Sequence, residues 1–352
     1  MPYLKKNFLK SESGSFVPAL AVALVPLLAA VGMVSDYSQG VTQRNSMQDA
    51  LDAASLSIMT LSKDLTKADR QVKLQEAYEA NSGKGTATLI DYAVTDDGTA
   101  TMSASATYAM PTEFMAMAGI NNVSIDVKAA ARKNPALVQA TFQIKKVSGY
   151  WNKTMSLYGI KFGETTVNKL MQIDYTYNGF GDPKGYGTST VSTVSKNSKG
   201  KEVLTQVQQQ VCTTKTVTTF SGAPADSIQQ TSGSKKYLTT CTMSPSASTG
   251  AVIDVSSMNT LYLQMDVPSG NPKTLKTNDP VTSNRLYIDG VESPSNKTVD
   301  IFSAVPCGQS STQAWEDGGN AVPAPVDNAD FFYTVTGKCN FSQRPSEVAL
   351  TQ

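Results

Sequence analysis

An uncharged apolar stretch near the start of the chain constrains the fold more than any other feature of the sequence. It extends from Phe16 to Val34, and Asp36 ends it. Three lysines precede it: Lys5, Lys6 and Lys10. As a helix with a rise of 1.5 Å per residue, this stretch measures about 28 Å, close to the ~30 Å hydrocarbon core of a bilayer. The sequence therefore predicts a transmembrane helix over residues 16–35.

The charges that flank this stretch predict its orientation. Because lysines precede it and an acidic residue follows it, the positive-inside rule places residues 1–15 in the cytoplasm as a short stub. The remainder of the chain is then translocated. A cleaved signal peptide is the alternative, since a basic start followed by an apolar run fits both. The run is longer than the usual 7–15-residue signal core and a helical pattern continues beyond it, which favours a retained anchor.

Residues 36–133 show the pattern of a long helix followed by a small antiparallel sheet, which is the shape of a pilin-like module. Apolar residues recur at helical spacing at Met47, Leu51, Ala54, Ile58, Leu61, Leu65 and Ala68. This stripe predicts one amphipathic helix that continues to about residue 80. Strands are expected over 86–94 and 99–108, joined by the turn Asp97-Gly98, with a third strand over 123–131.

The sequence pattern is different in residues 134–352, where helical periodicity disappears and short β-rich runs recur between turn residues. Regular short strands of this kind are typical of an antiparallel sandwich. The whole chain is therefore expected to be α+β: a transmembrane helix that continues into a pilin-like helix and sheet, then a β-sandwich-like all-β domain.

All four cysteines lie in this second region: Cys212, Cys241, Cys307 and Cys339. An even number in a translocated β domain predicts two disulfides, for which three connectivities are possible. The pairs Cys212–Cys241 and Cys307–Cys339 are favoured because each closes a local loop of about 30 residues. Zinc is the alternative, but the sequence has no CxxC pair to support it.

The absence of histidine excludes several classes of function. A chain without histidine cannot form a Ser-His-Asp triad, use a histidine general base, or bind zinc or haem through imidazole. The net charge is +1, whereas proteins that bind phosphate backbones carry a basic excess. We expect a protein that is not an enzyme, has no small-molecule substrate and binds no nucleic acid.

Two neighbouring acidic segments form the best candidate metal site: Glu316, Asp317, Asp327 and Asp330. Their carboxylates, with adjacent glycines that permit tight turns, offer the oxygen ligands that calcium prefers. The alternative is an acidic turn whose side chains accept hydrogen bonds from backbone amides. The spacing matches no EF-hand, and no other cofactor is expected.

A series of landmarks recurs in order through residues 1–60: Gly14-Ser15, Pro26, Gly32, Asp36-Tyr37, Arg44 and the run from Met47 to Ala54. They resemble the N-terminal region of the TadG-like proteins of the tight-adherence (Flp) pilus-assembly system. The segment from Pro111 through Phe114 to Gly119 is similar to the P-T-x-F … G segment of the same family. Many TadG-like proteins also carry a von Willebrand A domain with a DxSxS metal site. The nearest candidate is Asp254-Val255-Ser256-Ser257-Met258, in which Met258 stands where the motif requires its second serine. We therefore expect that domain to be absent.

The resemblance implies a membrane-anchored component of Tad/Flp pilus assembly that acts in adherence and biofilm formation. It implies a single span in the bacterial inner membrane, a periplasmic C-terminal body, and pilus-assembly or other envelope proteins as partners. The family motif falls on Gln48 and Asp52-Ala53-Ala54, with an architectural role, and Asp36 marks the membrane exit. The alternative hypothesis is a secreted or surface β-sandwich adhesin or carbohydrate-binding module.

Overall fold

The computed structural model describes residues 16–246, 250–305 and 307–351. The expected cytoplasmic stub, with its three lysines and Gly14-Ser15, lies outside the described residues. The chain divides into two compact units. The first comprises Met1–Asn134 with Pro345–Gln352, and the second is Pro135–Arg344.

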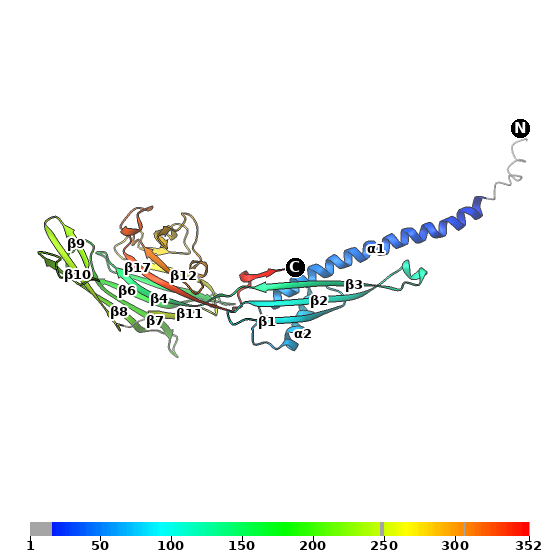
Figure 1. Cartoon of the computed structure of the whole chain (residues 1–352), viewed down its shortest axis with the longest axis horizontal. Helices are drawn as coiled ribbons and strands as arrows, with labels where there is room; N and C mark the ends of the chain where they lie inside the picture. The colour runs from blue at the N-terminus through cyan, green and yellow to red at the C-terminus, as the bar shows by residue number, and fades with distance from the viewer. Residues whose placement is uncertain (1–15, 247–249, 306, 352) are drawn as a thin grey trace, which may run out of the picture. The chain divides into compact units, whose positions relative to one another are not determined.

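Helix α1 (Phe16–Ile58) is continuous across the expected membrane span and the start of the expected pilin-like helix (Figure 1). Its apolar N-terminal half exposes side chains on every side: Leu20, Val22, Leu24, Leu27, Leu28, Val31, Met33 and Val34. A helix that is apolar all round suits lipid surroundings better than water. Among the described residues, α1 is the one helix long and apolar enough to cross a membrane.

The chain turns after Ile58, so the prediction of one helix as far as residue 80 was wrong. Helix α2 (Lys67–Ala80) begins after Thr66, whose side chain accepts a hydrogen bond from the N–H of Asp69. The buried Arg70 of α2 donates to the carbonyls of Ile58 and Ser62, at 2.7 Å each. The N-cap and this guanidinium stabilise a helix start and a helix end that periodicity alone does not reveal.

An antiparallel sheet completes the first unit, in the order β1-β2-β3-β18. Its strands are β1 (Thr86–Val94), β2 (Ala100–Pro111), β3 (Asn122–Lys133) and β18 (Val348–Leu350). The predicted apolar stripe of α1 is buried at Met47, Leu51, Ala54 and Ile58. Helix α1 lies along β2 and β3, so this stripe forms the core between helix and sheet (Figure 1).

The last strand corrects the expected extent of the second domain. That domain was expected to contain all of residues 134–352. Instead, η6 (Pro345–Glu347) and β18 belong to the first unit, where Val348, Ala349 and Leu350 pair with the end of β3. A strand this short carries no periodic signal, and its pairing depends on a free sheet edge formed far earlier in the chain.

The second unit contains two antiparallel sheets within the described residues. One has the order β13-β12-β5-β6-β7-β8-β10-β9 and the other the order β11-β4-β17-β16-β14-β15. The strands are β4 (Ala136–Val147), β5 (Lys153–Lys161), β6 (Val167–Tyr177), β7 (Gly187–Lys196), β8 (Glu202–Val217), β9 (Ile228–Ser232), β10 (Lys235–Ser244), β11 (Ala251–Asp254), β12 (Met258–Asp266), β13 (Thr274–Lys276), β14 (Leu286–Ile288), β15 (Val291–Glu292), β16 (Ser310–Trp315) and β17 (Phe331–Asn340). Short helical turns lie at η3 (Met115–Ala118) in the first unit, and at η4 (Ser283–Arg285), α3 (Ile301–Ala304) and η5 (Val326–Asn328) in the second.

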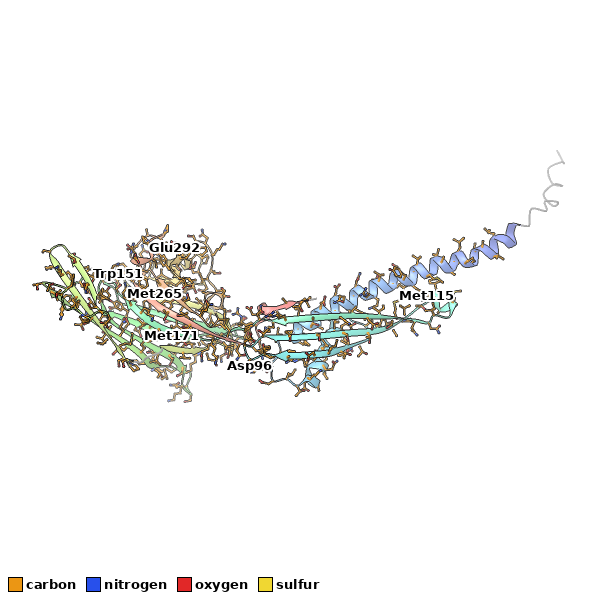
Figure 2. All side chains as sticks on the ribbon, in the orientation of Figure 1. Asp96, Met115, Trp151, Met171, Met265 and Glu292 are labelled. Carbon is orange, nitrogen blue, oxygen red and sulfur yellow. A yellow bond between two sulfur atoms is a disulfide. The ribbon has the colours of Figure 1, made fainter. Side chains whose placement is uncertain are left out.

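One hydrophobic core joins these two sheets. Alternate residues of β4 and β5, such as Phe142 and Leu157, are fully buried in it. Figure 2 labels Met171 of β6 and Met265 of β12, which belong to the same core. Alternating burial on two facing sheets is the pattern of a sandwich, so the expected α+β class with a β-sandwich-like domain is confirmed.

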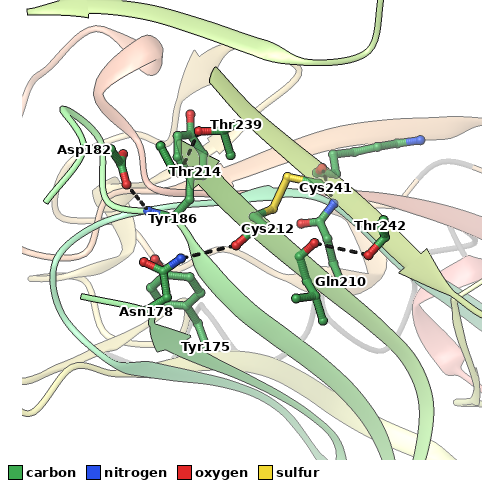
Figure 3. The surroundings of a disulfide bond; sticks show 12 residues. Tyr175, Asn178, Asp182, Tyr186, Gln210, Cys212, Thr214, Thr239, Cys241 and Thr242 are labelled. Carbon is green, nitrogen blue, oxygen red and sulfur yellow. Dashed lines mark hydrogen bonds between the residues drawn. A yellow bond between two sulfur atoms is a disulfide. The ribbon is translucent and has the colours of Figure 1, made fainter. Parts of the chain in front are cut away.

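The structure contains both disulfides that the local-loop argument favoured. Cys212 on β8 and Cys241 on β10 are direct register partners, with Cα atoms 4.0 Å apart. Around this bond Asn178 donates to the carbonyl of Cys212, as Figure 3 shows. Cys307 is joined to Cys339 of β17. Both bonds lie within the second unit. The first connects the paired strands β8 and β10, and the second connects β17 to Cys307, which forms a bridge with Gly337 of the same strand.

Candidate functional site

The side chain of Asp36 holds the loop between β2 and β3 against helix α1. Its carboxylate accepts hydrogen bonds from the backbone N–H groups of Glu113, Phe114 and Met115, at 3.2, 3.0 and 2.7 Å. Asp36 is almost completely buried. Figure 2 labels Met115 at the far end of the β2–β3 hairpin, beside α1. A carboxylate that accepts three N–H groups satisfies backbone donors at the start of η3, which no strand pairs.

Gly32 lies one helical turn before Asp36 and contacts the same loop. A Cβ atom at Gly32 would lie 2.5 Å from both Cβ and Cγ of Phe114, a separation that real atoms do not adopt. Residues four apart share one face of a helix, so Gly32 and Asp36 face the loop together. Gly32 leaves room for Phe114, and Asp36 supplies the hydrogen-bond acceptors. We name this contact the clasp: Gly32 and Asp36 of α1 with residues 113–115.

The clasp unites two parts of the sequence that the family resemblance identified separately. Asp36 was expected to mark the membrane exit, and Pro111–Gly119 was noted as a similar segment, but no contact between them was expected. Thr112 helps to close the loop, because its N–H donates to the carbonyl of Asn121 and its hydroxyl donates to the carbonyl of Ile120. Gly119 ends η3 with φ of 84°, a conformation that favours glycine.

The tip of the same loop exposes apolar side chains. Phe114 is 42%, Met117 86% and Ile120 45% exposed, and the sequence from 114 to 125 carries no charge. Of these residues, Phe114 lies against Gly32, which is inside the apolar stretch of α1. The exposed apolar surface of the helix thus continues onto the hairpin tip.

A cleft of about 660 Å³ lies between α1 and the hairpin beside the clasp. Its lining includes Met33, Tyr37 and Val41 of the helix and Met110 and Ile125 of the strands. Arg44 and Asp126 are the charged residues at its margin besides Asp36. The cleft is mainly apolar, as expected of a surface close to a lipid boundary or to another apolar chain.

The family motif lies further along α1 and joins the helix to β3. The side-chain amide of Gln48 donates to Asp52 Oδ1 at 2.9 Å and to the carbonyl of Lys128 at 2.8 Å. Ala54 is buried and Ala53 is half-buried, so the small side chains allow the helix to approach the sheet closely. These contacts are consistent with the architectural role that the resemblance implied.

The structure brings together three of the four carboxylates expected to bind calcium. Ligand atoms of Glu316, Asp317 and Asp330 lie within 4.8 Å of one another. Asp327, in η5, does not belong to this group, so the predicted set of four is not assembled.

A lysine of the chain already lies among these carboxylates. The Lys153 ammonium contacts the carboxylate of Asp317 directly and lies 3.7 Å from Asp330 Oδ2. The pKa of Asp330 is raised to about 7, mainly by burial and also by the neighbouring Asp317 and Glu316, against the opposing effect of Lys153. A calcium ion would have to compete with Lys153 for Asp317. The sequence analysis did not include Lys153, although it lies in phase with the buried Met155 and Leu157.

Comparisons with known proteins bear on the N-terminal segment. No curated protein and no solved structure matches the chain. Residues 14–57 match a family model described as "Putative Flp pilus-assembly TadE/G-like". This segment contains Gly32, Asp36 and the Gln48–Ala54 motif, and it therefore supplies the helix side of the clasp. The resemblance drawn from the sequence is confirmed: the chain carries a TadE/G-like Flp pilus-assembly segment at its N-terminal end.

Proposed function

We propose that this protein is a membrane-anchored, non-enzymatic component of Tad/Flp pilus assembly that acts in the bacterial cell envelope. In this proposal, residues 16–35 cross the inner membrane once, the N-terminus is cytoplasmic, and residues 36–352 are periplasmic. The clasp carries the proposal, because its helix side lies in the segment that matches the family and ties the end of the apolar stretch to a folded sheet.

The two disulfides support the proposed location of the second unit. Disulfides form and persist in oxidising compartments such as the periplasm, and are rare in the cytosol. Both bonds lie on the C-terminal side of the apolar helix, as the proposed orientation requires.

In the proposed orientation the hairpin tip meets the membrane surface. The clasp holds the tip beside the last turns of the apolar stretch, so Phe114, Met117 and Ile120 reach the lipid headgroup region. Apolar and aromatic side chains are favourable at this depth. The hairpin thus becomes a second membrane contact that limits the tilt of α1.

Fractionation and protease protection test the topology. The full-length protein should remain in the membrane pellet after alkaline carbonate extraction, and both units should be degraded in spheroplasts whose inner membrane is intact. Protein in the carbonate supernatant would contradict the anchor. Protection of the second unit in intact spheroplasts would contradict the orientation.

A pair of glycine substitutions tests whether the clasp serves pilus assembly. Gly32→Ala places a Cβ against Phe114, whereas a Cβ at Gly40, two turns further along the same helix, would lie at an ordinary 3.6 Å from Met110 Cε. We expect the Gly32 variant to reduce surface pili in a complemented deletion strain, and the Gly40→Ala control to leave them unchanged. Equal piliation at equal protein levels would contradict a role for the clasp.

A cleft in the second unit favours one alternative function, that of a carbohydrate-binding adhesin. It has a volume of about 400 Å³ and is lined by Tyr150, Trp151, Asp317, Asn320 and Asn328, among others. Aromatic faces with amide and carboxylate groups suit a sugar ring and its hydroxyls. A glycan array probed with the full-length protein discriminates the two hypotheses, since specific binding that Trp151→Ala removes would support the alternative.

A further inference from the structure

Lys153 is fully buried in the sandwich, although lysine is among the residues least often buried. It begins β5, where Lys153, Met155 and Leu157 alternate onto the core-facing side. The sequence alternation therefore directs an ammonium group into the hydrophobic core between the sheets.

The partner of Lys153 comes from the opposite sheet. Asp317 follows β16 and lies in phase with the fully buried Trp315, so its carboxylate also faces inward. Lys153 Nζ contacts Asp317 Oδ2 directly and donates to the carbonyl of Ser148 at 2.9 Å. Both side chains are almost completely removed from solvent, with 0% and 4% of their surfaces exposed. The amine of one segment and the carboxylate of a distant one are thus held in contact with little exposure to solvent.

A second carboxyl group, that of Asp330, is positioned to move protons between Lys153 and Asp317. Asp330 Oδ2 lies 3.7 Å from Lys153 Nζ, and burial raises its pKa to about 7, so Asp330 is often a neutral acid at physiological pH. Glu316 is also buried there, but its two oxygens accept hydrogen bonds from the backbone and side-chain amides of Asn320. Asp330 is therefore the group that faces the Lys153–Asp317 pair as a proton donor and acceptor.

A glycine makes room for this group of side chains. A Cβ at Gly149 would lie 2.6 Å from Lys153 Nζ and 3.2 Å from Asp317 Oδ2. Gly149 also has φ of 108°, which side-chain-bearing residues rarely adopt. On another side, the ring of Tyr175 has its centroid 5.5 Å from Nζ. The Lys153 amine is therefore confined beside both carboxyl groups, and such proximity is the condition under which an intramolecular reaction is fast.

We propose that Lys153 and Asp317 form an intramolecular isopeptide bond, with Asp330 as the catalytic acid and base. An ammonium proton first passes to the Asp317 carboxylate, which leaves a neutral amine and a neutral acid. The nitrogen lone pair then attacks Cγ of Asp317, and the Cγ–Oδ2 bond breaks. Asp330 donates a proton to the departing oxygen and takes one from the nitrogen, so it returns to its starting state. The products are an amide and one water molecule, and no oxidant or reductant is needed.

The amide removes an electrostatic cost that the ion pair bears. Two charges buried in a low-dielectric core lose their hydration, and their mutual attraction repays this loss only in part. A neutral amide has no such charge. It also links β5 of one sheet covalently to the end of β16 in the other, across a sequence separation of 164 residues. The bond therefore locks the sandwich independently of the two disulfides, and it does not depend on the proposed function.

Intact-mass spectrometry of the full-length protein tests the proposal. The cysteines are reduced and alkylated first, so that the disulfides do not contribute. We expect a mass that is lower than the sequence mass by one water molecule, and a tryptic map with a branched peptide joining Lys153 to Asp317. A full sequence mass, or a water deficit located elsewhere, would overturn the proposal.

Three variants separate the isopeptide from its chemical rival, a succinimide at Asp317-Gly318, which also releases water. Lys153→Arg keeps the positive charge but has no reactive amine, so it should restore the full mass. A deficit that persists in this variant would identify the succinimide and overturn the proposal. Asp330→Asn cannot shuttle protons and should slow the reaction about 100-fold, which leaves mainly unreacted protein in fresh preparations. Lys146→Arg is the matched control near Asp330 and should retain the deficit. If a variant does not fold, the branched peptide of the unmodified sequence decides the question.

Discussion

Replacement of Arg70 by methionine should destabilise the first unit while the second unit remains unchanged. The Arg70 guanidinium is completely buried and donates to the carbonyls of Ile58 and Ser62, at and just beyond the end of α1. It also lies over the ring of Tyr92, with 3.7 Å from Cζ to the ring centroid. Methionine has a similar length and keeps the apolar packing, so Arg70→Met removes mainly the polar contacts.

The size of the effect follows from these contacts. Each of the two charge-assisted hydrogen bonds contributes about 1.5–3 kcal/mol, and a desolvated cation–π contact about 2 kcal/mol. Two costs oppose them in the unsubstituted protein: the charge is desolvated, and Arg70 Nε has no hydrogen-bond partner among the described residues. We therefore expect a net loss of about 3 kcal/mol in the free energy of unfolding, equivalent to a melting temperature lower by roughly 10 °C.

The distribution of tryptophan makes the assay specific to each unit. The only two tryptophans of the sequence, Trp151 and Trp315, both lie in the second unit. Tryptophan fluorescence of the full-length protein in detergent therefore reports the second unit, while far-UV circular dichroism reports both. Arg70→Met should lower a dichroism transition and leave the fluorescence transition in place, and the exposed Arg132→Met should change neither. A loss below about 1 kcal/mol, or an equal shift in fluorescence, would refute the reasoning.

Four further predictions concern the hairpins and the second unit. Met117→Glu, at the exposed tip, should weaken protection of residues 112–121 from hydrogen exchange when the full-length protein is in nanodiscs; exchange equal to that of the unsubstituted protein would contradict contact with lipid. Hydrogen bonds from the hydroxyl of Thr95 and from Thr99 lower the pKa of Asp97 below 3.8, so the stability it lends to the β1–β2 turn is present above that value and is lost as pH falls through its lower folded-state value; an NMR midpoint at or above 3.8 would be inconsistent with this. Removal of Cys212–Cys241 by paired serine substitutions should lower the unfolding free energy of the second unit by about 3–4 kcal/mol in urea titrations, because the bond closes a local loop. Millimolar calcium added after chelation should leave the fluorescence transition unchanged, since Lys153 already occupies the contact with Asp317, whether as an ion pair or as the proposed amide; a clear rise in melting temperature would restore the calcium hypothesis.

Local patterns predicted the parts of the fold that local chemistry determines. Spacing of apolar residues located the buried face of α1, the Asp97-Gly98 turn located the first hairpin, and short-loop closure favoured the observed disulfides. The break between α1 and α2 was missed, because the apolar spacing continues through Leu61 and Leu65 although the chain turns there. There the caps and the Arg70 contacts, rather than periodicity, decide where the helices end.

The sites depend on contacts between distant residues, which explains what the sequence did not predict. Asp36 meets loop residues that follow it by 77 to 79 positions, and Lys153 meets Asp317 after 164 positions. A signal for Lys153 was nevertheless present, since a charged residue in phase with buried Met155 and Leu157 requires a buried partner. An acidic segment elsewhere in the same sandwich is the natural place to look for that partner.

The matching segment covers the whole apolar stretch and ends deep in the first unit, so it contains both places at which the rest of the unit holds α1. Between Asp36 and Met47 most side chains of α1 are exposed, so over a distance of about 16 Å the helix receives little support from the core. It is held at two places: the clasp at one end, and the packing of Met47 to Ile58 with the Gln48 hydrogen bond at the other. Two separated attachments fix a direction, whereas one would leave the helix free to pivot. Because the proposed membrane span and the sheet share this single helix, the two attachments together would let the orientation of the span determine how the folded unit faces the membrane.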